Sequence, residues 1–216
     1  MRVPASKTRP SGSVTTRKAH CACNPSGRDQ LYPDEIREIA GNHFKGIKNK
    51  PCPMPLKFSN GSKYDDLIAG WTQYWNEVLK PKVPLEPNLV KALIASESSF
   101  DPTILANKKD SNSARGLTQI TNGTRKILGD EKGELKDHYI TATKKDLSDP
   151  GINICAGIRW LYRKRDIATA KLGHNASWEE AVYEYKGLDS APKVRQKQLW
   201  DKFKEYLGKY QKCGQK

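Results

Sequence analysis

The sequence predicts an all-α, α-rich fold. In several segments, apolar residues recur at three- and four-residue steps, a spacing that gathers them on one face of a helix. Residues that cap or end helices flank these segments, and no segment alternates apolar and polar residues as a half-exposed strand does. With 216 residues and 36% hydrophobic content, the chain can form one domain with a core. No apolar run is long enough to span a membrane.

The pattern divides the chain near residue 60 into an N-terminal extension, residues 1–60, and a helical domain, residues 61–216. Residues 1–30 are rich in Ser, Thr, Pro, Gly, Lys and Arg, a composition typical of a tail or linker. A short helix is predicted from Pro33 to about Phe44. The prolines within residues 51–55 then exclude regular structure, so the extension should be largely irregular.

The helices of the domain follow in order. A long apolar stripe over residues 64–80 predicts a core helix, in which Trp71 and Trp75 pack inside. Pro87 suits the first turn of the next helix, and Asp149 suits the N-cap of a later one. In full, helices are expected after residue 80 over residues 87–98, 123–128, 149–172, 177–186 and 191–212.

Glu97 interrupts the apolar stripe of the helix over residues 87–98. Val90, Leu93 and Ile94 are spaced i, i+3 and i+4, and Glu97 takes the i+7 position. Burial among apolar side chains disfavours the charged form of a carboxyl group, and a carboxyl group that keeps its proton is what a general acid requires. The alternative is a carboxylate at a fraying helix end that turns out to water.

Four motifs follow one another within residues 89–187. A helix ends in Glu97 and Ser98, and later segments read Gly-Leu-Thr-Gln-Ile (116–120), Asn-Ile-Cys-Ala-Gly-Ile-Arg-Trp-Leu (153–161) and Ala-Val-Tyr-Glu-Tyr-Lys-Gly (181–187). In this order the motifs resemble those of the lytic transglycosylase and goose-type lysozyme superfamily. Thr118 stands where that superfamily usually has Met, and Lys186 where it prefers Asn.

The resemblance implies a lysozyme-like helical domain that cuts peptidoglycan between N-acetylmuramic acid and N-acetylglucosamine, with Glu97 as the general acid and without a cofactor or metal. It also implies a set of substrate-binding residues. Gln119 could bind an acetamido group, Tyr185 could orient Glu97 or merely pack, and Ser98 could bond near the acid or simply end the helix. Thr118 would alter an apolar wall beside the sugar, and Asn153 opens the third motif.

The product depends on a second carboxylate, because a hydrolase usually needs one to activate water and a lytic transglycosylase does not. Asp110 lies thirteen residues after Glu97 in a polar loop, an offset at which goose-type lysozymes carry an acid. Asp101 is the other candidate, although an Asp before Pro102 often caps a turn. Thr121 replaces a second acid of those lysozymes. Hydrolysis is slightly favoured; a transglycosylase giving 1,6-anhydro products and a non-catalytic wall-binding module are the alternatives.

The chain carries a net charge of +14, with a pI near 9.5. Such a surface attracts polyanions, of which the anionic cell wall and nucleic acid are two. The sequence has no nucleic-acid recognition motif, so we expect peptidoglycan strands as the partner and no specific nucleic acid.

Five cysteines leave at least one thiol unpaired. Cys155 falls on the apolar side of a predicted helix and is expected in the core. Cys21, Cys23 and Cys52 could hold zinc with His20, or two of the three could form a disulfide in an oxidising compartment.

The first residues lack the apolar segment of a secretory signal peptide. We therefore expect export by another route to a periplasm or cell wall. An antibacterial effector with a secretion-machine carrier and an immunity protein would fit, as would a lysis enzyme.

Overall fold

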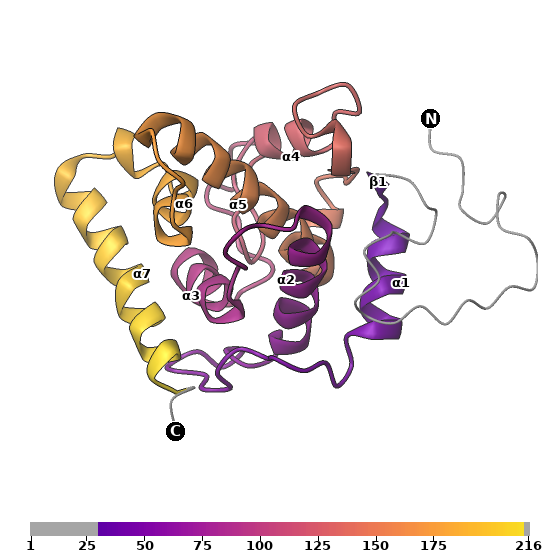
Figure 1. Ribbon diagram of the computed structural model, residues 1–216, viewed down its shortest axis with the longest axis horizontal. Helices are drawn as coiled ribbons and strands as arrows, with labels where there is room; N and C mark the ends of the chain where they lie inside the picture. Colours follow the sequence, from indigo (N-terminus) through magenta and orange to yellow (C-terminus); the bar gives the residue numbers. More distant parts are fainter. Residues whose placement is uncertain (1–29, 214–216) are drawn as a thin grey trace, which may run out of the picture.

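The computed structural model describes residues 30–213 and is mostly helical (Figure 1). The seven α-helices of this part are α1 (Pro33–His43), α2 (Asp65–Leu79), α3 (Pro87–Ser98), α4 (Asn122–Leu128), α5 (Pro150–Leu172), α6 (Trp178–Tyr185) and α7 (Lys193–Cys213). Short 3-10 turns are η2 (Lys136–His138), η3 (Asp146–Ser148) and η4 (Leu188–Ser190). The strands β1 (Gln30–Leu31) and β2 (Tyr139–Ile140) pair in parallel. The α-rich prediction is confirmed.

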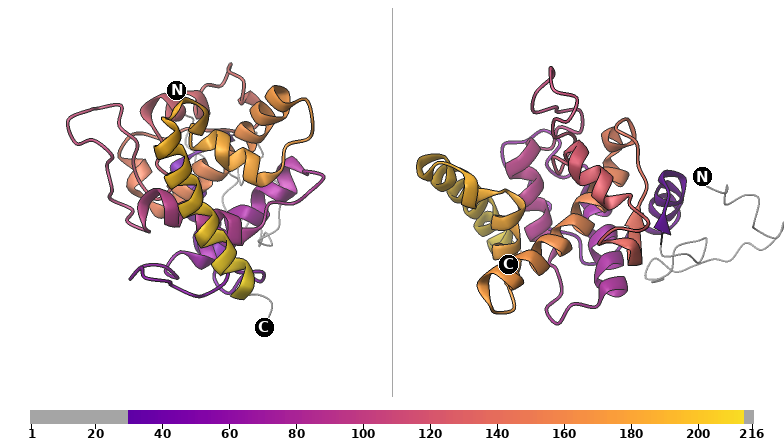
Figure 2. Two further views of the ribbon diagram at one scale, coloured as in Figure 1. Left: turned by 90° about the vertical axis from the view of Figure 1, so that its left-hand side faces the viewer. Right: turned by 90° about the horizontal axis from the view of Figure 1, so that it is seen from above.

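Two helices form the centre of the arrangement. Helix α5 packs against α1, α2 and α6, and α3 packs against α2 and α7. Helix α7 lies along the side of the molecule opposite α1 (Figure 1) and crosses in front of the other helices when that side faces the viewer (Figure 2, left). The helix that carries Glu97 is thus covered by α7.

The predicted helix starts are confirmed where a side chain caps them. The Asp149 carboxylate accepts the backbone N–H groups of Gly151 at 2.9 Å and Ile152 at 3.2 Å, and Pro150 occupies the first turn of α5. Ser177 and Glu180 form a reciprocal capping box at α6. These caps satisfy donors that the first turn of a helix leaves open.

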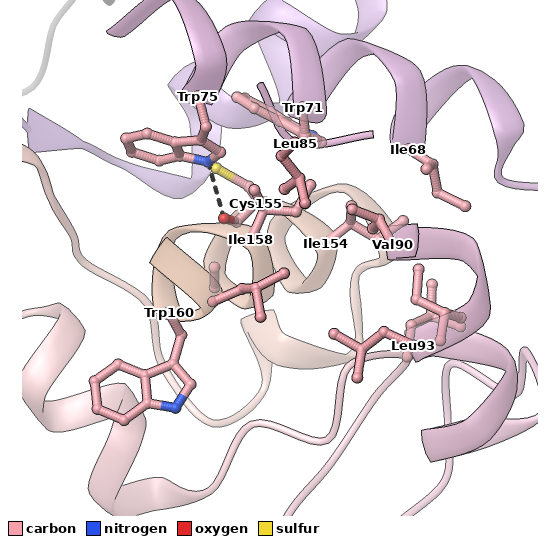
Figure 3. Packing of buried hydrophobic residues seen from close by; sticks show 14 of the residues in the cluster. Ile68, Trp71, Trp75, Leu85, Val90, Leu93, Ile154, Cys155, Ile158 and Trp160 are labelled. Carbon is pink, nitrogen blue, oxygen red and sulfur yellow. Dashed lines mark hydrogen bonds between the residues drawn. The ribbon is translucent and has the colours of Figure 1, made fainter. Parts of the chain in front are cut away.

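The core forms around α2, α3 and α5, as the apolar stripes predicted (Figure 3). Trp71 and Trp75 are 0% and 1% exposed, and the Trp75 indole donates to the Cys155 carbonyl at 3.0 Å. Cys155 is a buried free thiol, as expected, and burial raises the pKa of Cys155. This thiol is therefore an inert core group.

Residues 30–60 add apolar side chains to the same core. Ile36 and Phe44 are buried, and the Phe44 ring meets Trp71 edge to face at 5.0 Å between centroids. Gly70 makes this contact possible, because a Cβ atom at that position would lie 2.2 Å from the Phe44 ring. The division near residue 60 stays a prediction.

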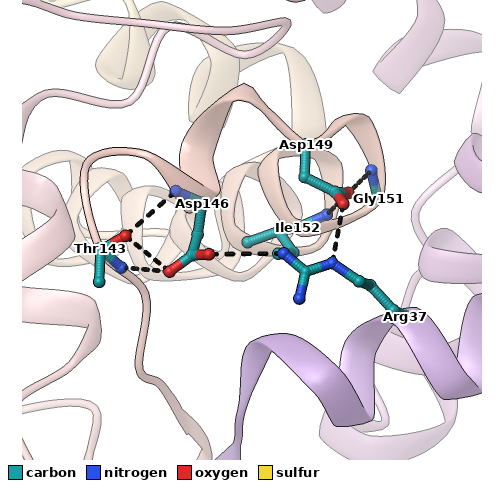
Figure 4. A network of polar contacts seen from close by, with 6 residues as sticks. All are labelled: Arg37, Thr143, Asp146, Asp149, Gly151 and Ile152. Atoms are coloured by element: carbon teal, nitrogen blue, oxygen red, sulfur yellow. Dashed lines mark hydrogen bonds and ion pairs between the residues drawn. The ribbon is translucent and has the colours of Figure 1, made fainter.

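A network of polar contacts ties α1 to the start of α5 (Figure 4). Arg37 contacts Asp149 at 3.0 Å and Asp146 at 3.4 Å, and Asp146 also accepts the backbone N–H and hydroxyl of Thr143. Burial acts to raise the pKa of Asp146, but the Thr143 hydrogen bonds and the Arg37 charge outweigh it, so this pKa is lowered.

The cysteine prediction needs a correction. Cys52 forms a disulfide with Cys213, at the end of α7, so it is not available for zinc or for a bond with Cys21 or Cys23. Those two cysteines lie outside the described residues. The disulfide joins the loop before α2 to the last turn of α7. The buried ammonium of Lys91 donates to the Cys52 carbonyl and forms an ion pair with Asp65 at 2.7 Å.

Within residues 30–213, none of the helices combines the length and the apolar character that crossing a membrane requires.

Candidate active site

Helix α3 presents Glu97 one residue before its end. Ser99 closes the helix in the left-handed conformation at φ 54°, and Phe100 follows at φ 63°. Two successive non-glycine residues in this region are unfavourable. The turn is fixed because the Phe100 side chain is fully buried. Strain of this kind next to a polar side chain is typical of functional sites.

Glu97 is paired with an ammonium group. Its side chain is 18% exposed, and its Oε1 atom forms an ion pair with Lys186, whose side chain is 3% exposed. The Lys186 ammonium also donates to the Ser96 hydroxyl at 3.1 Å. The stripe predicted apolar surroundings for Glu97; that expectation is corrected, because the buried side chain of Lys186, the residue that follows α6, lies at this position. An adjacent ammonium stabilises the ionised form of a carboxyl group.

Tyr185 connects the acid to the loop over residues 116–120. Its hydroxyl donates to the Thr118 carbonyl at 2.6 Å. Burial raises the pKa of Tyr185, and the nearby Glu97 charge raises it further. The phenol therefore remains protonated and keeps its hydrogen bond. Glu97, Tyr185 and Thr118, from three separate motifs, come together here.

Asn153 holds this loop on α5. Its side-chain oxygen accepts the backbone N–H and the hydroxyl of Thr118, both at 2.7 Å. Its side-chain nitrogen donates to the carbonyls of Arg115 at 3.1 Å and Leu147 at 2.9 Å. The residue is fully buried and its amide is saturated with protein partners, so it positions the loop.

Two glycines allow the loop to approach α5 closely. A Cβ atom at Gly116, which has φ 75°, would lie 2.2 Å from the Asn153 amide nitrogen. A Cβ atom at Gly157 would lie 2.4 Å from the Thr118 hydroxyl. The Thr118 side chain is consequently enclosed between α5 and its own loop, and not on an exposed wall.

The remaining predicted substrate contacts also have protein partners. The Ser98 hydroxyl donates to the Ile94 carbonyl at 3.1 Å and is buried. The Gln119 amide donates to the Gly116 carbonyl at 2.9 Å, and Gln119 itself has φ 53°. Contact of a sugar with Ser98, Thr118, Gln119, Tyr185 or Asn153 stays a prediction.

Both candidate water-handling acids lie in exposed turns. The Asp101 carboxylate accepts the N–H of Thr103 at 2.8 Å and its hydroxyl at 2.7 Å, the capping role that its sequence context predicts. The Asp110 carboxylate accepts the Asn112 N–H at 2.8 Å. Among the described residues, the only ion pair of Glu97 is with Lys186, and Asp110 forms none.

Sequence reasoning missed Ser96 and the Lys186 ion pair. Lys186 lies 89 residues from Glu97, and only its departure from the Asn of the fourth motif marked it as unusual. Ser96 carried no motif signal of its own.

A family model described as Transglycosylase SLT domain matches residues 74–206. The matched range includes α3, the loop over residues 116–120, α5 and α6, and thus all of the residues described above around Glu97. No curated protein and no solved structure matches the chain.

Proposed function

Because the chain belongs to the transglycosylase SLT domain family, we propose that it cleaves peptidoglycan between N-acetylmuramic acid and N-acetylglucosamine, with Glu97 as the catalytic acid and base. Membership of this family carries peptidoglycan-cleaving activity of the lysozyme or transglycosylase type. One observation supports the role of Glu97 above all: its partly exposed carboxyl group lies in the last turn of α3 near Tyr185, whose hydroxyl contacts the loop over residues 116–120.

The proposed reaction returns Glu97 to its starting state. Glu97 gives its proton to the glycosidic oxygen as the bond from C1 of the muramic sugar breaks. The resulting carboxylate then takes the proton of the 6-hydroxyl group, whose oxygen forms a bond to the same C1 atom. No water is consumed, and the product is a 1,6-anhydro sugar. Lys186 would stabilise Glu97 in its ionised stage.

This product is preferred over hydrolysis because the second carboxylate lacks structural support. Water activation by Asp110 would place that carboxylate opposite the acid across the sugar. In the structure the Asp110 carboxylate is bonded to its own turn. The slight preference for hydrolysis that the sequence suggested is therefore reversed in our proposal.

Hydrolysis remains a second candidate on one observation. The Asp110 loop is exposed, and one hydrogen bond leaves its carboxylate able to accept a water proton. Mass spectrometry of digested peptidoglycan separates the two reactions: fragments lighter by one water support the anhydro product, and reducing ends show hydrolysis.

Glu97→Gln tests the role of the acid. This variant keeps the shape of the side chain but has no proton to give, so release of soluble fragments from purified sacculi should fall by a factor of about 100 or more. Glu86→Gln, an exposed residue before the same helix, is the matched control and should keep full activity. Full activity in Glu97→Gln would refute the proposal. Sedimentation of the wild-type protein with sacculi without any release would indicate a wall-binding module instead.

We also propose that the protein acts outside the cytoplasm, as an exported antibacterial effector with a carrier and an immunity partner, or as a lysis enzyme. The Cys52–Cys213 disulfide supports the location, because such bonds persist in oxidising compartments. Expression directed to the periplasm of a Gram-negative host should lyse the cells, and expression in the cytoplasm should not. Equal toxicity from both would contradict this location.

A further inference from the structure

Two lysines without an ion pair extend the positive charge around Glu97 and Lys186: Lys202 interacts electrostatically with both residues, and Lys57 interacts with Lys202. Lys202 comes from α7 and Lys57 from the loop between α1 and α2, and neither forms an ion pair among the described residues. We call Lys57, Lys186 and Lys202 the lysine cluster. Lys186 is paired with Glu97, so the other two provide positive charge that no ion pair among the described residues neutralises.

An aromatic platform supports the two unpaired lysines. The Lys57 ammonium lies 6.0 Å from the Phe58 ring, and the Lys202 ammonium lies 6.0 Å from the Tyr206 ring. Phe58 and Tyr206 meet edge to face at 5.5 Å, and Phe58 also meets Phe100 at 5.5 Å. Phe100 belongs to the turn that ends the Glu97 helix, so the platform connects the positions of both lysines to the turn beside the acid.

The electrostatics agree with this geometry. Burial lowers the pKa of Lys202, the charges of Lys186 and Lys57 lower it further, and the charge of Glu97 opposes them. Glu205 feels the Lys57 charge as well, but it is already paired with Lys209. The cluster therefore has a positive excess that an anionic ligand group would neutralise.

We propose that Lys57 and Lys202 form a subsite for a carboxylate attached to the muramic sugar, so that the enzyme prefers acidic glycan strands to neutral ones. This inference rests on the proposed function, because it places the lysines beside the bond that Glu97 cleaves. The chemistry recognised is a carboxylate, a partner that the ammonium of lysine binds as a point charge. In peptidoglycan the peptide stem offers it, and on a muramic sugar without a stem the lactyl group offers it, because attachment of the stem converts the lactyl carboxylate to an amide.

Sacculi free of teichoic acid provide the test, in three forms: untreated, with their carboxylates converted to methylamides, and stripped of stems by an amidase, which leaves the lactyl carboxylate. Wild-type protein should release fragments from untreated sacculi about five to ten times faster than from amidated sacculi, the effect of one or two partly exposed ion pairs. In the Lys57→Ala/Lys202→Ala variant the two rates should become equal.

Lys197→Ala/Lys212→Ala is the matched control. It removes the same charge from exposed positions on α7 and should keep the wild-type preference, which separates a local subsite from the general attraction of a basic protein to an anionic wall. Circular dichroism of both variants checks that the fold is unchanged.

The outcomes are distinct. A wild-type rate that is the same on untreated and amidated sacculi overturns the subsite, as does an unchanged preference in Lys57→Ala/Lys202→Ala. Wild-type release from stripped strands that is as fast as from untreated sacculi assigns the subsite to the lactyl carboxylate. Release that is as slow as from amidated sacculi assigns it to the stem. Absence of release from every form contradicts the proposed function itself, not the subsite.

Discussion

At position 186, an ammonium group contacts the carboxyl group that, in the proposed reaction, carries the proton given to the glycosidic oxygen. The Lys186 side chain is almost completely buried, and its other contact is the Ser96 hydroxyl. The ion pair suits the stage of the proposed reaction in which Glu97 is ionised and opposes the stage in which it is protonated. One of the two residues that depart from the family motifs is thus in direct contact with the proposed acid.

Lys186→Asn should raise the rate of fragment release at neutral pH. Without the ammonium group, protonation of Glu97 no longer has to break an ion pair, a contribution of about 1 kcal/mol or fivefold in rate. Release from sacculi measured under fixed conditions checks this. Lys164→Asn removes a comparable lysine, which pairs with Glu184 on α6, and should leave the rate unchanged. A slower Lys186→Asn enzyme would show that the lysine positions Glu97.

Gly157→Ala should destabilise the protein and reduce activity together. The added methyl group would meet the Thr118 hydroxyl at 2.4 Å and displace the loop that Tyr185 contacts, with a loss of about 1–3 kcal/mol. Chemical denaturation and fragment release measure the two effects. Gly208→Ala, in α7, meets nothing within 4 Å, so it should keep activity and gain about 0.5–1 kcal/mol. Equal stability of the two variants would contradict the packing argument.

Among the elements, α1 packs against α5 and α2, and its polar link to η3 and α5 runs through Arg37 (Figure 4). The guanidinium group bridges two carboxylates, each of which also caps or closes a turn. This bridge fixes α1 against the beginning of the helix that carries Asn153.

Arg37→Ala should lower the free energy of unfolding by about 1 kcal/mol at pH 7, since the arginine is half exposed. The pKa of Asp146 is lowered in the folded protein. Its contribution is therefore present above the ordinary Asp value and lost as the pH falls below about 4. Denaturation curves at pH 7 and in acid should show the difference between variant and wild type shrinking. A difference that grows in acid would contradict the assignment.

The helices were predictable because their signals are local. Asp149 before Pro150, and Ser177 three residues before Glu180, identify helix starts without any knowledge of the fold. The pair β1–β2 was not predictable, since two residues per strand show no alternation. In the site, Glu97 and Tyr185 were found through motifs. The ion pair with Lys186 was not, because no local pattern relates residues on separate helices.

At the scale of the whole molecule, the Cys52–Cys213 disulfide connects two parts of the chain that are far apart in sequence. It spans 161 residues, a separation at which the sequence offers no cue to the partner. The link between the loop before α2 and the end of α7 fixes the helix that packs on α3.

Cys213→Ser should lower the free energy of unfolding by about 2 to 5 kcal/mol, because the unfolded chain has a higher conformational entropy without the disulfide. Thermal denaturation with and without a reducing agent checks this: reduction should shift the wild type to the value of the variant. Cys155→Ala controls for the loss of a cysteine: it keeps the disulfide, so its stability should fall on reduction as the stability of the wild type does. A wild type that is insensitive to reduction would contradict the bond.

The same bond sets a geometric limit on transport. A chain closed into so large a ring cannot be drawn end first through a narrow pore as a single extended thread. A channel of that kind would have to handle the polypeptide with both thiols still reduced, and oxidation on the far side would then lock the protein in its folded form.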